Sequence, residues 1–171
     1  MTLTKYQKKR DFKKTTEPNG KVSKKSEKKN ISRELKLKGK VTRRKPIRLP
    51  RFVVHKHHAS HLHWDLRLEM SGVLKSWAVP KEPPKTKNVK RLAIQVEDHP
   101  LEYAKFHGTI PEGNYGAGKV EIWDNGTYEL KNKDSKKIEI VFHGKKFKGD
   151  YVLVKTSYGN KPEKSWLFFR V

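Results

Sequence analysis

The sequence has 171 residues, about the size of one domain, and its 41 Lys and Arg against 18 Asp and Glu give a net charge of +23. It contains no cysteine, which excludes disulfides, thiolate nucleophiles and Cys-ligated zinc or iron–sulfur sites. It also has no apolar run long enough to span a membrane and no secretory signal pattern, so we expect a cytoplasmic protein without a membrane partner. The excess of positive charge predicts a polyanionic partner.

The positive charge is concentrated at the start of the chain. The first 50 residues carry 19 Lys and Arg against four acidic residues, whereas all four Trp and most of the Phe, Val and Ile follow them. Residues 20–45 are Lys-rich and of low complexity, which is typical of a mobile linker, with one short helical turn expected at 31–37. We therefore divide the chain into a basic N-terminal arm over residues 1–50 and a folded domain over residues 51–171.

From residue 51 onward, short runs rich in β-branched and aromatic residues are separated by Gly, Pro and Asn, a pattern typical of an all-β sandwich or barrel. A tight hairpin turn is expected at residues 124–126, because Asn-Gly accepts the positive φ angles that such turns demand. The Gly-rich run at 113–118 is interpreted as a structural turn. The expected strands cover 51–57, 61–70, 73–79, 91–97, 118–123, 127–130, 137–143, 149–156 and 164–170.

Five of the eight histidines lie between His55 and His63, which is the most unusual feature of the sequence. Strand side chains alternate, so Trp64 and its even-numbered neighbours are expected to face a core, while His63, Asp65, Arg67 and Glu69 share one exposed face.

In the preceding strand His55 and His57 share a face, and a short turn at 59–60 brings His57 beside His63 and Asp65. Two imidazoles and one carboxylate suit Mn²⁺, Fe²⁺ or Zn²⁺ and leave coordination positions for water and substrate. The crowding of histidines and the nearby Arg67 favour this metal site over a set of solvated surface histidines.

A second polar row is expected on residues 91–99. Here Leu92, Ile94 and Val96 are expected to point inward, and Arg91, Ala93, Gln95, Glu97 and His99 outward. Beside the first row, Arg67 and Arg91 would offer forked donors to phosphate oxygens, and His99 would bind a phosphoryl group or protonate a leaving oxygen. A bound water is the alternative proton donor, and a plain Arg91–Glu97 ion pair is an equally open interpretation of the pattern.

Several segments resemble a known family. VVHKHHASHLHWDLRLEMSGVLKSWAVPKEPP and RLAIQVEDHPLEYAKFHGTIPEGNYGAGKVEIWDNGTYEL closely resemble the phosphoesterase domain of bacterial DNA ligase D and its free-standing homologues. RDFKKTTEP, from Arg10 to Pro18, is similar to the N-terminal motif of that family, and WLFFRV at the C-terminus also matches. The resemblance implies an all-β fold, a small closed or nearly closed barrel of about eight antiparallel strands with a basic N-terminal arm.

The resemblance also implies an activity. It points to a Mn²⁺-dependent enzyme, with other divalent transition metals such as Co²⁺ as alternatives, that heals 3′ ends in DNA repair. Such an enzyme removes a terminal ribonucleoside by phosphodiester cleavage and then hydrolyses the remaining 3′-phosphate to a 3′-hydroxyl. Its partners would be DNA or RNA 3′ ends, such as a primer-template ending in a ribonucleotide or a 3′-phosphate, together with a separate DNA ligase or polymerase and an end-binding protein.

By the same resemblance the metal ligands fall on His57, His63 and Asp65, and the phosphate contacts on Arg67 and His99. The arm is then expected to fold over the site. His55 stands where this family more often has Gln, and it is expected to contact the phosphate through a hydrogen bond or to compete for the metal. The remaining family positions fall on Lys81, Arg91, Glu97 and Tyr103, and in the arm on Arg10, Asp11 and Glu17.

Two other classes of protein remain to be distinguished. Two His and one Asp also form the facial triad of non-haem Fe(II) oxygenases on β-barrel folds, and that activity would depend on oxygen and a keto acid. A non-catalytic nucleic-acid-binding module would explain the charge, and its binding would survive a chelator and the loss of His63.

Overall fold

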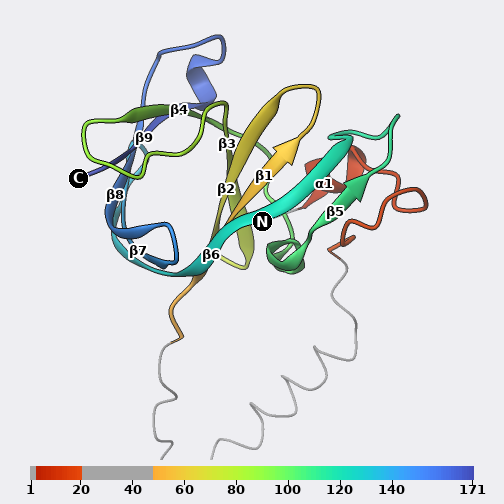
Figure 1. The fold of residues 1–171 in the computed structure, drawn as a ribbon, viewed down its shortest axis with the longest axis horizontal. Coiled ribbons are helices and arrows are strands. Elements are labelled where there is room, and N and C mark those ends of the chain that lie inside the picture. Colours follow the sequence, from red (N-terminus) through yellow and green to blue (C-terminus); the bar gives the residue numbers. More distant parts are fainter. Residues whose placement is uncertain (1–2, 21–47) are drawn as a thin grey trace, which may run out of the picture.

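The computed structural model describes residues 3–20 and 48–171, and the strands within them form one antiparallel sheet of nine strands (Figure 1). The sheet order is β1-β2-β3-β4-β9-β8-β7-β6-β5, and an added β1–β6 pairing closes eight of the strands into a barrel, with β5 outside it on β6. The expected all-β barrel is thereby confirmed. The strands are β1 (Arg51–His58), β2 (Leu62–Met70), β3 (Val73–Val79), β4 (Lys90–Gln95), β5 (Gly108–Ile110), β6 (Gly118–Lys133), β7 (Lys137–Gly144), β8 (Lys148–Lys155) and β9 (Ser165–Arg170).

Within the described residues the helices are short: one α-helix, α1 (Thr4–Lys8), and two 3₁₀ helices, η1 (Leu101–Lys105) and η2 (Pro162–Lys164). No helix among the described residues is long and apolar enough to cross a membrane. The helical turn expected at 31–37 and the Lys-rich linker lie outside the described residues.

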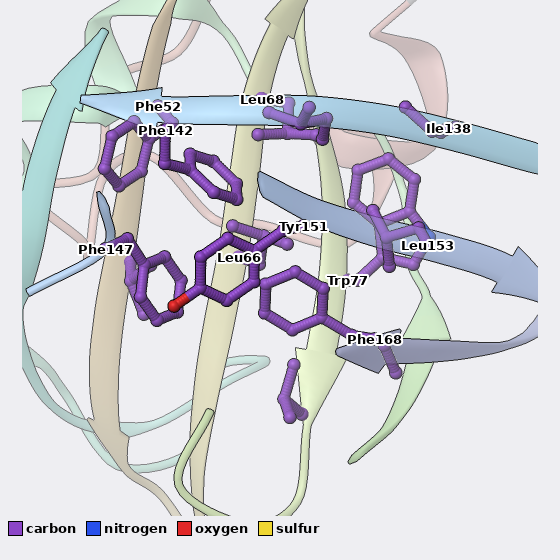
Figure 2. Close-up of a cluster of buried hydrophobic side chains, with 14 of the residues drawn as sticks. Phe52, Leu66, Leu68, Trp77, Ile138, Phe142, Phe147, Tyr151, Leu153 and Phe168 are labelled. Atoms are coloured by element: carbon purple, nitrogen blue, oxygen red, sulfur yellow. The ribbon is translucent and has the colours of Figure 1, made fainter. Parts of the chain in front are cut away.

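An aromatic-rich core fills the barrel (Figure 2). Leu66 and Leu68 of β2 are fully buried in it, as the alternation of that strand predicts. The rings of Phe142, Phe147 and Tyr151 pack with centroids 5.0–5.3 Å apart. Burying side chains of this size contributes about 1.5–3 kcal/mol each, so this interior is the main source of the stability of the barrel.

A second apolar cluster lies on the outside of the barrel, between β1, β3 and the segments that cover them. Tyr6 of α1 is fully buried there, and its hydroxyl donates a 2.6 Å hydrogen bond to the carbonyl of Pro18. Tyr103 of η1 and Ile110 of β5 belong to the same cluster. The arm, η1 and β5 therefore form a second layer over one outer face of the barrel, and polar side chains on that face are buried beneath it.

The prediction of a hairpin turn at residues 124–126 is wrong. β6 runs without a break through these residues, and Asp124, Asn125 and Gly126 pair with β1 beside a register shift at Val54/His55. The Asp124 carboxylate accepts hydrogen bonds from the backbone N–H groups of residues 145–147. A Cβ on Gly126 would lie 2.3 Å from the carbonyl oxygen of His143. These residues therefore serve a tight contact between neighbouring strands, and not a turn.

The side chains of β4 also point the opposite way from the one expected. Ala93 is fully buried in the barrel core, whereas Leu92 and Ile94 are only partly buried on the outside. Ala93 pairs with Trp166, whose ring packs edge-on against Trp77 at a centroid distance of 6.1 Å. Two indole rings fill this part of the interior, so a small residue faces them and the larger aliphatic residues point out.

Candidate active site

The β1–β2 hairpin brings His57, His63 and Asp65 together. His57 pairs directly with His63 across the two strands, and Asp65 is the next residue on the same face of β2. One potential ligand atom from each residue lies within 4.8 Å of the others. Asp65 Oδ2 is 3.7 Å from His57 Nδ1, and its Oδ1 is 3.7 Å from His63 Nε2. The expected convergence of these three side chains is confirmed.

Backbone carbonyls orient both imidazoles. His57 Nε2 donates to the carbonyl of Gly116 at 2.9 Å, and His63 Nδ1 donates to the carbonyl of His61 at 2.9 Å. The other nitrogen of each ring then faces Asp65, which is the arrangement that supports metal-ligating histidines. Burial would raise the pKa of Asp65, but Arg67 and the two histidines outweigh it and hold that pKa well below its usual range. With both rings neutral, the donor set is two imidazole nitrogens and one ionised carboxylate, which fits a divalent transition metal with open positions.

Arg67 is held by three hydrogen bonds. Its Nη2 donates to Asp65 Oδ2 at 3.0 Å, its Nη1 to Ser76 Oγ at 2.9 Å, and its Nε to His55 Nδ1 at 3.2 Å. The guanidinium also lies 4.7 Å from the ring centroid of Tyr103. A guanidinium has five N–H groups, so one N–H on each Nη is left for an oxyanion in the cavity.

His55 lies behind Arg67 and does not line the cavity. Burial, together with the positive charge of Arg67, lowers the pKa of His55 to about 3. The ring is therefore neutral and acts as an acceptor for Arg67. Its geometry is that of a residue that positions the guanidinium, whereas direct contact with phosphate was expected from the sequence.

The arm adds a second buried cation, Arg10, which folds over the site as expected. Arg10 Nε donates to Glu17 Oε1 at 2.8 Å, Nη1 to Glu97 Oε1 at 3.2 Å and Nη2 to His99 Nε2 at 3.2 Å. Tyr103 also donates to Glu17 Oε1, at 3.0 Å. Arg10 and Glu17 are almost fully buried, so the arm forms a wall of the site through these contacts.

His99 accepts from Arg10 through Nε2 and donates through Nδ1 to the carbonyl of Glu97 at 2.9 Å. Burial lowers the pKa of His99 well below its usual value, and the charges of Arg67 and Arg10 lower it further. A neutral ring with its lone pair on Arg10 is a poor source of a proton. The geometry therefore favours His99 as a residue that holds Arg10.

These side chains surround one cavity of about 250 Å³. Tyr115 and Gly116 also line it, and neither was expected to be functional from the sequence. Ser76, on which Arg67 depends, was missed too, because one polar residue in an alternating strand carries no functional signal. The expected site residues that line the cavity are His57, His63, Asp65, Arg67, Arg10, Glu97, His99 and Tyr103.

Three expected site residues lie elsewhere. Lys81 is exposed just beyond β3. Arg91 donates to the carbonyl of Glu82 at 2.9 Å, and the Arg91–Glu97 ion pair left open by the sequence is not formed. The carboxylate of Asp11 accepts from the backbone N–H of Lys13 at 3.1 Å within the arm. None of the three lines the cavity.

Comparison with known proteins places this site in a family. The family model for the DNA Ligase D 3′-phosphoesterase domain matches residues 55–155. The multifunctional non-homologous end joining protein LigD of Pseudomonas aeruginosa is 41% identical over 170 residues, which cover 96% of this chain and 18% of that protein. The LigD protein of Mycolicibacterium smegmatis is 41% identical over 180 residues, which cover 99% of this chain and 20% of that protein.

The LigD protein of Mycobacterium bovis is 52% identical over 110 residues, which cover 62% of this chain and 14% of that protein. The chain thus spans about a fifth, or less, of the length of these relatives. The matched segment of the family model contains the three candidate metal ligands, Arg67 and His99, while Arg10 and Glu17 precede it. This chain belongs to the DNA ligase D 3′-phosphoesterase domain family.

Proposed function

We propose that this protein is a divalent-metal-dependent phosphoesterase that acts on the 3′ ends of nucleic acid strands during DNA repair by end joining. The observation that carries the proposal is the meeting of a His-His-Asp triad and two buried guanidiniums at one cavity. The triad is suited to a metal, and the guanidiniums are suited to the oxygens of a phosphate. The family membership supports the same class of reaction.

The metal would be held by His57, His63 and Asp65, and Mn²⁺ is the ion that we propose. When bound, a divalent ion supplies Lewis-acid polarisation of a phosphate oxygen and lowers the pKa of a bound water. The two free N–H groups of Arg67 donate to the phosphoryl oxygens and stabilise the charge that develops on them.

The remaining residues hold this arrangement in place. Arg10 adds positive charge on the arm side of the cavity, where Glu17, Glu97 and His99 fix its orientation. Because these contacts exist before substrate binds, little reorganisation is required when charge develops on the phosphoryl group. Protonation of the leaving oxygen is assigned to water.

We propose two successive reactions at this one site. The first cleaves the phosphodiester that joins a terminal ribonucleoside, and the second hydrolyses the resulting 3′-phosphate to leave a 3′-hydroxyl. Both reactions need the same groups around one phosphorus atom, which is why a single triad and a single pair of arginines suffice. Roles for Lys81, Arg91 and Asp11 remain predictions of the family resemblance, since these residues lie outside the cavity.

The test is cleavage of a 5′-labelled primer-template that ends in a ribonucleotide or in a 3′-phosphate, with Mn²⁺ or with EDTA. We expect Mn²⁺-dependent conversion to a 3′-hydroxyl, lost in His63→Ala but retained in His61→Ala, which alters an exposed neighbouring histidine. Unchanged ends with EDTA-resistant binding would instead identify a non-catalytic binding module. Turnover that requires oxygen and a keto acid would identify an oxygenase.

A further inference from the structure

A groove along the outer face of β4 continues from the catalytic cavity. The cavity and the first part of this β4 groove share Val96, Glu97 and Tyr115 as lining residues. The first part in turn shares Ile94 and Lys161 with a further hollow that reaches Tyr158. The outward facing of Ile94 and its aliphatic neighbours on β4 thus provides the floor of a track that begins at the candidate metal site.

The β4 groove is strongly basic. Lys5 and Lys9 of the arm line one part of it, and Lys161 and Lys164 line another. Glu97 is the only acidic residue that lines it among those described, and this carboxylate already pairs with Lys9 at 3.0 Å and with Arg10. Among the described residues, no carboxylate forms a salt bridge with Lys5, Lys161 or Lys164. The groove therefore attracts anions along its length.

An exposed tyrosine lies at each end of the β4 groove. Tyr115, at the junction with the catalytic cavity, is 49% exposed, and Tyr158 at the far end is 71% exposed. Lys9 holds Tyr115 in place, with its Nζ 3.2 Å from the tyrosine hydroxyl and 4.4 Å from the ring centroid. Lysines beside exposed aromatic rings are the features by which proteins bind single strands without reading their sequence.

We propose that the strand bearing the reactive 3′ end leaves the catalytic cavity along the β4 groove. Its terminal unpaired bases stack at Tyr115, and its phosphates contact Lys161 and Lys164. From Leu92 to Val96 the floor extends about 13 Å, which spans about four phosphates of a stacked strand. The direction of the strand rests on the proposed function, whereas single-strand binding in the groove does not.

Binding is tested in EDTA, so that catalysis plays no part. The probe is a 5′-fluorescein DNA 12-mer with a 3′-phosphate, and its Kd is measured by anisotropy from 50 to 200 mM salt. Lys161→Ala combined with Lys164→Ala should weaken binding about tenfold and reduce the slope of log K against log salt by about 1.4, since each phosphate contact in single strands contributes about 0.7. Lys145→Ala combined with Lys148→Ala, at the β7–β8 turn, removes the same charge elsewhere and should change the slope by less than about 0.5. Equal effects of the two double substitutions would refute binding of the strand in the β4 groove.

The direction of the strand is tested with 2-aminopurine. Placed next to the 3′ terminus it should change fluorescence on binding, and Tyr115→Leu should abolish that change, whereas a probe eight nucleotides away should respond equally to both proteins. An equal Tyr115 dependence at both positions would overturn the proposed direction. If the binding of a blunt duplex depends equally on Lys161 and Lys164, the proposal that the groove binds unpaired bases is refuted. Cleavage by wild type without groove-dependent binding would leave the proposed function standing and refute the path.

Discussion

The ion pair between Arg10 and Glu17 should be a major determinant of how firmly the arm is docked. The Arg10 side chain is 5% exposed and that of Glu17 is 0% exposed, with Nε and Oε1 2.8 Å apart. Arg10→Met leaves Glu17 with only the hydroxyl groups of Thr15 and Tyr103 as partners. Removing one partner of a buried ion pair costs about 3–5 kcal/mol, because the remaining charge stays desolvated. We therefore expect Arg10→Met to destabilise the docked arm by about 3 kcal/mol.

The loss should appear as arm undocking before it appears as barrel unfolding. The barrel has its own core, whereas the arm is held by Tyr6, Arg10 and a few neighbouring contacts. Hydrogen exchange should therefore show reduced protection over residues 3–20 in Arg10→Met, with little change in β7 or β8. Arg10→Met combined with Glu17→Gln removes both charges and should recover at least about 1 kcal/mol relative to additivity.

Two results would refute this reasoning. One is a cost of less than about 1 kcal/mol for Arg10→Met in the hydrogen exchange of residues 3–20, which is the range of solvent-exposed pairs. The other is strict additivity of the two substitutions. Thr15→Val serves as a control, because it removes the two hydrogen bonds between Thr15 Oγ1 and Glu17 and leaves the guanidinium in place.

Three further predictions concern the metal, the pH dependence and the backbone. Mn²⁺ at 100 times its Kd should stabilise the wild type by about 2.7 kcal/mol but leave the melting temperature of His57→Ala unchanged, as thermal unfolding can measure. Because the pKa of His55 falls from 6.5 to about 3 on folding, its contribution to stability is present above pH 6.5 and is lost as the pH falls toward 3. In the metal-free protein, the free energy of unfolding measured with urea should therefore fall by about 2 kcal/mol less in His55→Gln than in wild type when the pH is lowered from 7 to 5. His107→Gln, at an exposed position, should behave as wild type. Gly118→Ala should cost at least about 3 kcal/mol, because its Cβ would lie 2.0 Å from the carbonyl oxygen of His58, whereas Gly113→Ala, with open space around it, should cost about 1–2 kcal/mol.

Local alternation was sufficient to predict the metal candidate. β2 alternates strictly, and its partner β1 follows after a short turn, so the side chains that meet across the hairpin can be read from spacing alone. That reading places His57 beside His63 and Asp65, as the structure does. The same alternation wrongly predicted that Asp65 and Arg67 are exposed. Both side chains are buried beneath a layer made by segments far away in the chain.

Long-range packing explains what the sequence could not predict. The Asn125–Gly126 pair carries a strong local turn signal, but pairing with β1 and the close approach of Gly126 to β7 determine its conformation. The orientation of β4 depends on how much space two tryptophans leave opposite Ala93, which no local pattern records. The docking of Arg10 was anticipated from family resemblance, because composition alone describes the arm only as basic.

The two halves of the candidate site differ in how far apart their residues lie along the chain. The metal candidate is assembled within a single hairpin, from His57 to Asp65. The arm side of the cavity instead needs Arg10 to meet Glu97 and His99, across sequence separations of 87 and 89 residues. Loop-closure entropy makes such distant contacts later to form and easier to lose. On the proposed function, a molecule could therefore hold a metal while its arm is open, and metal occupancy alone would overestimate the fraction of molecules that are competent to bind phosphate.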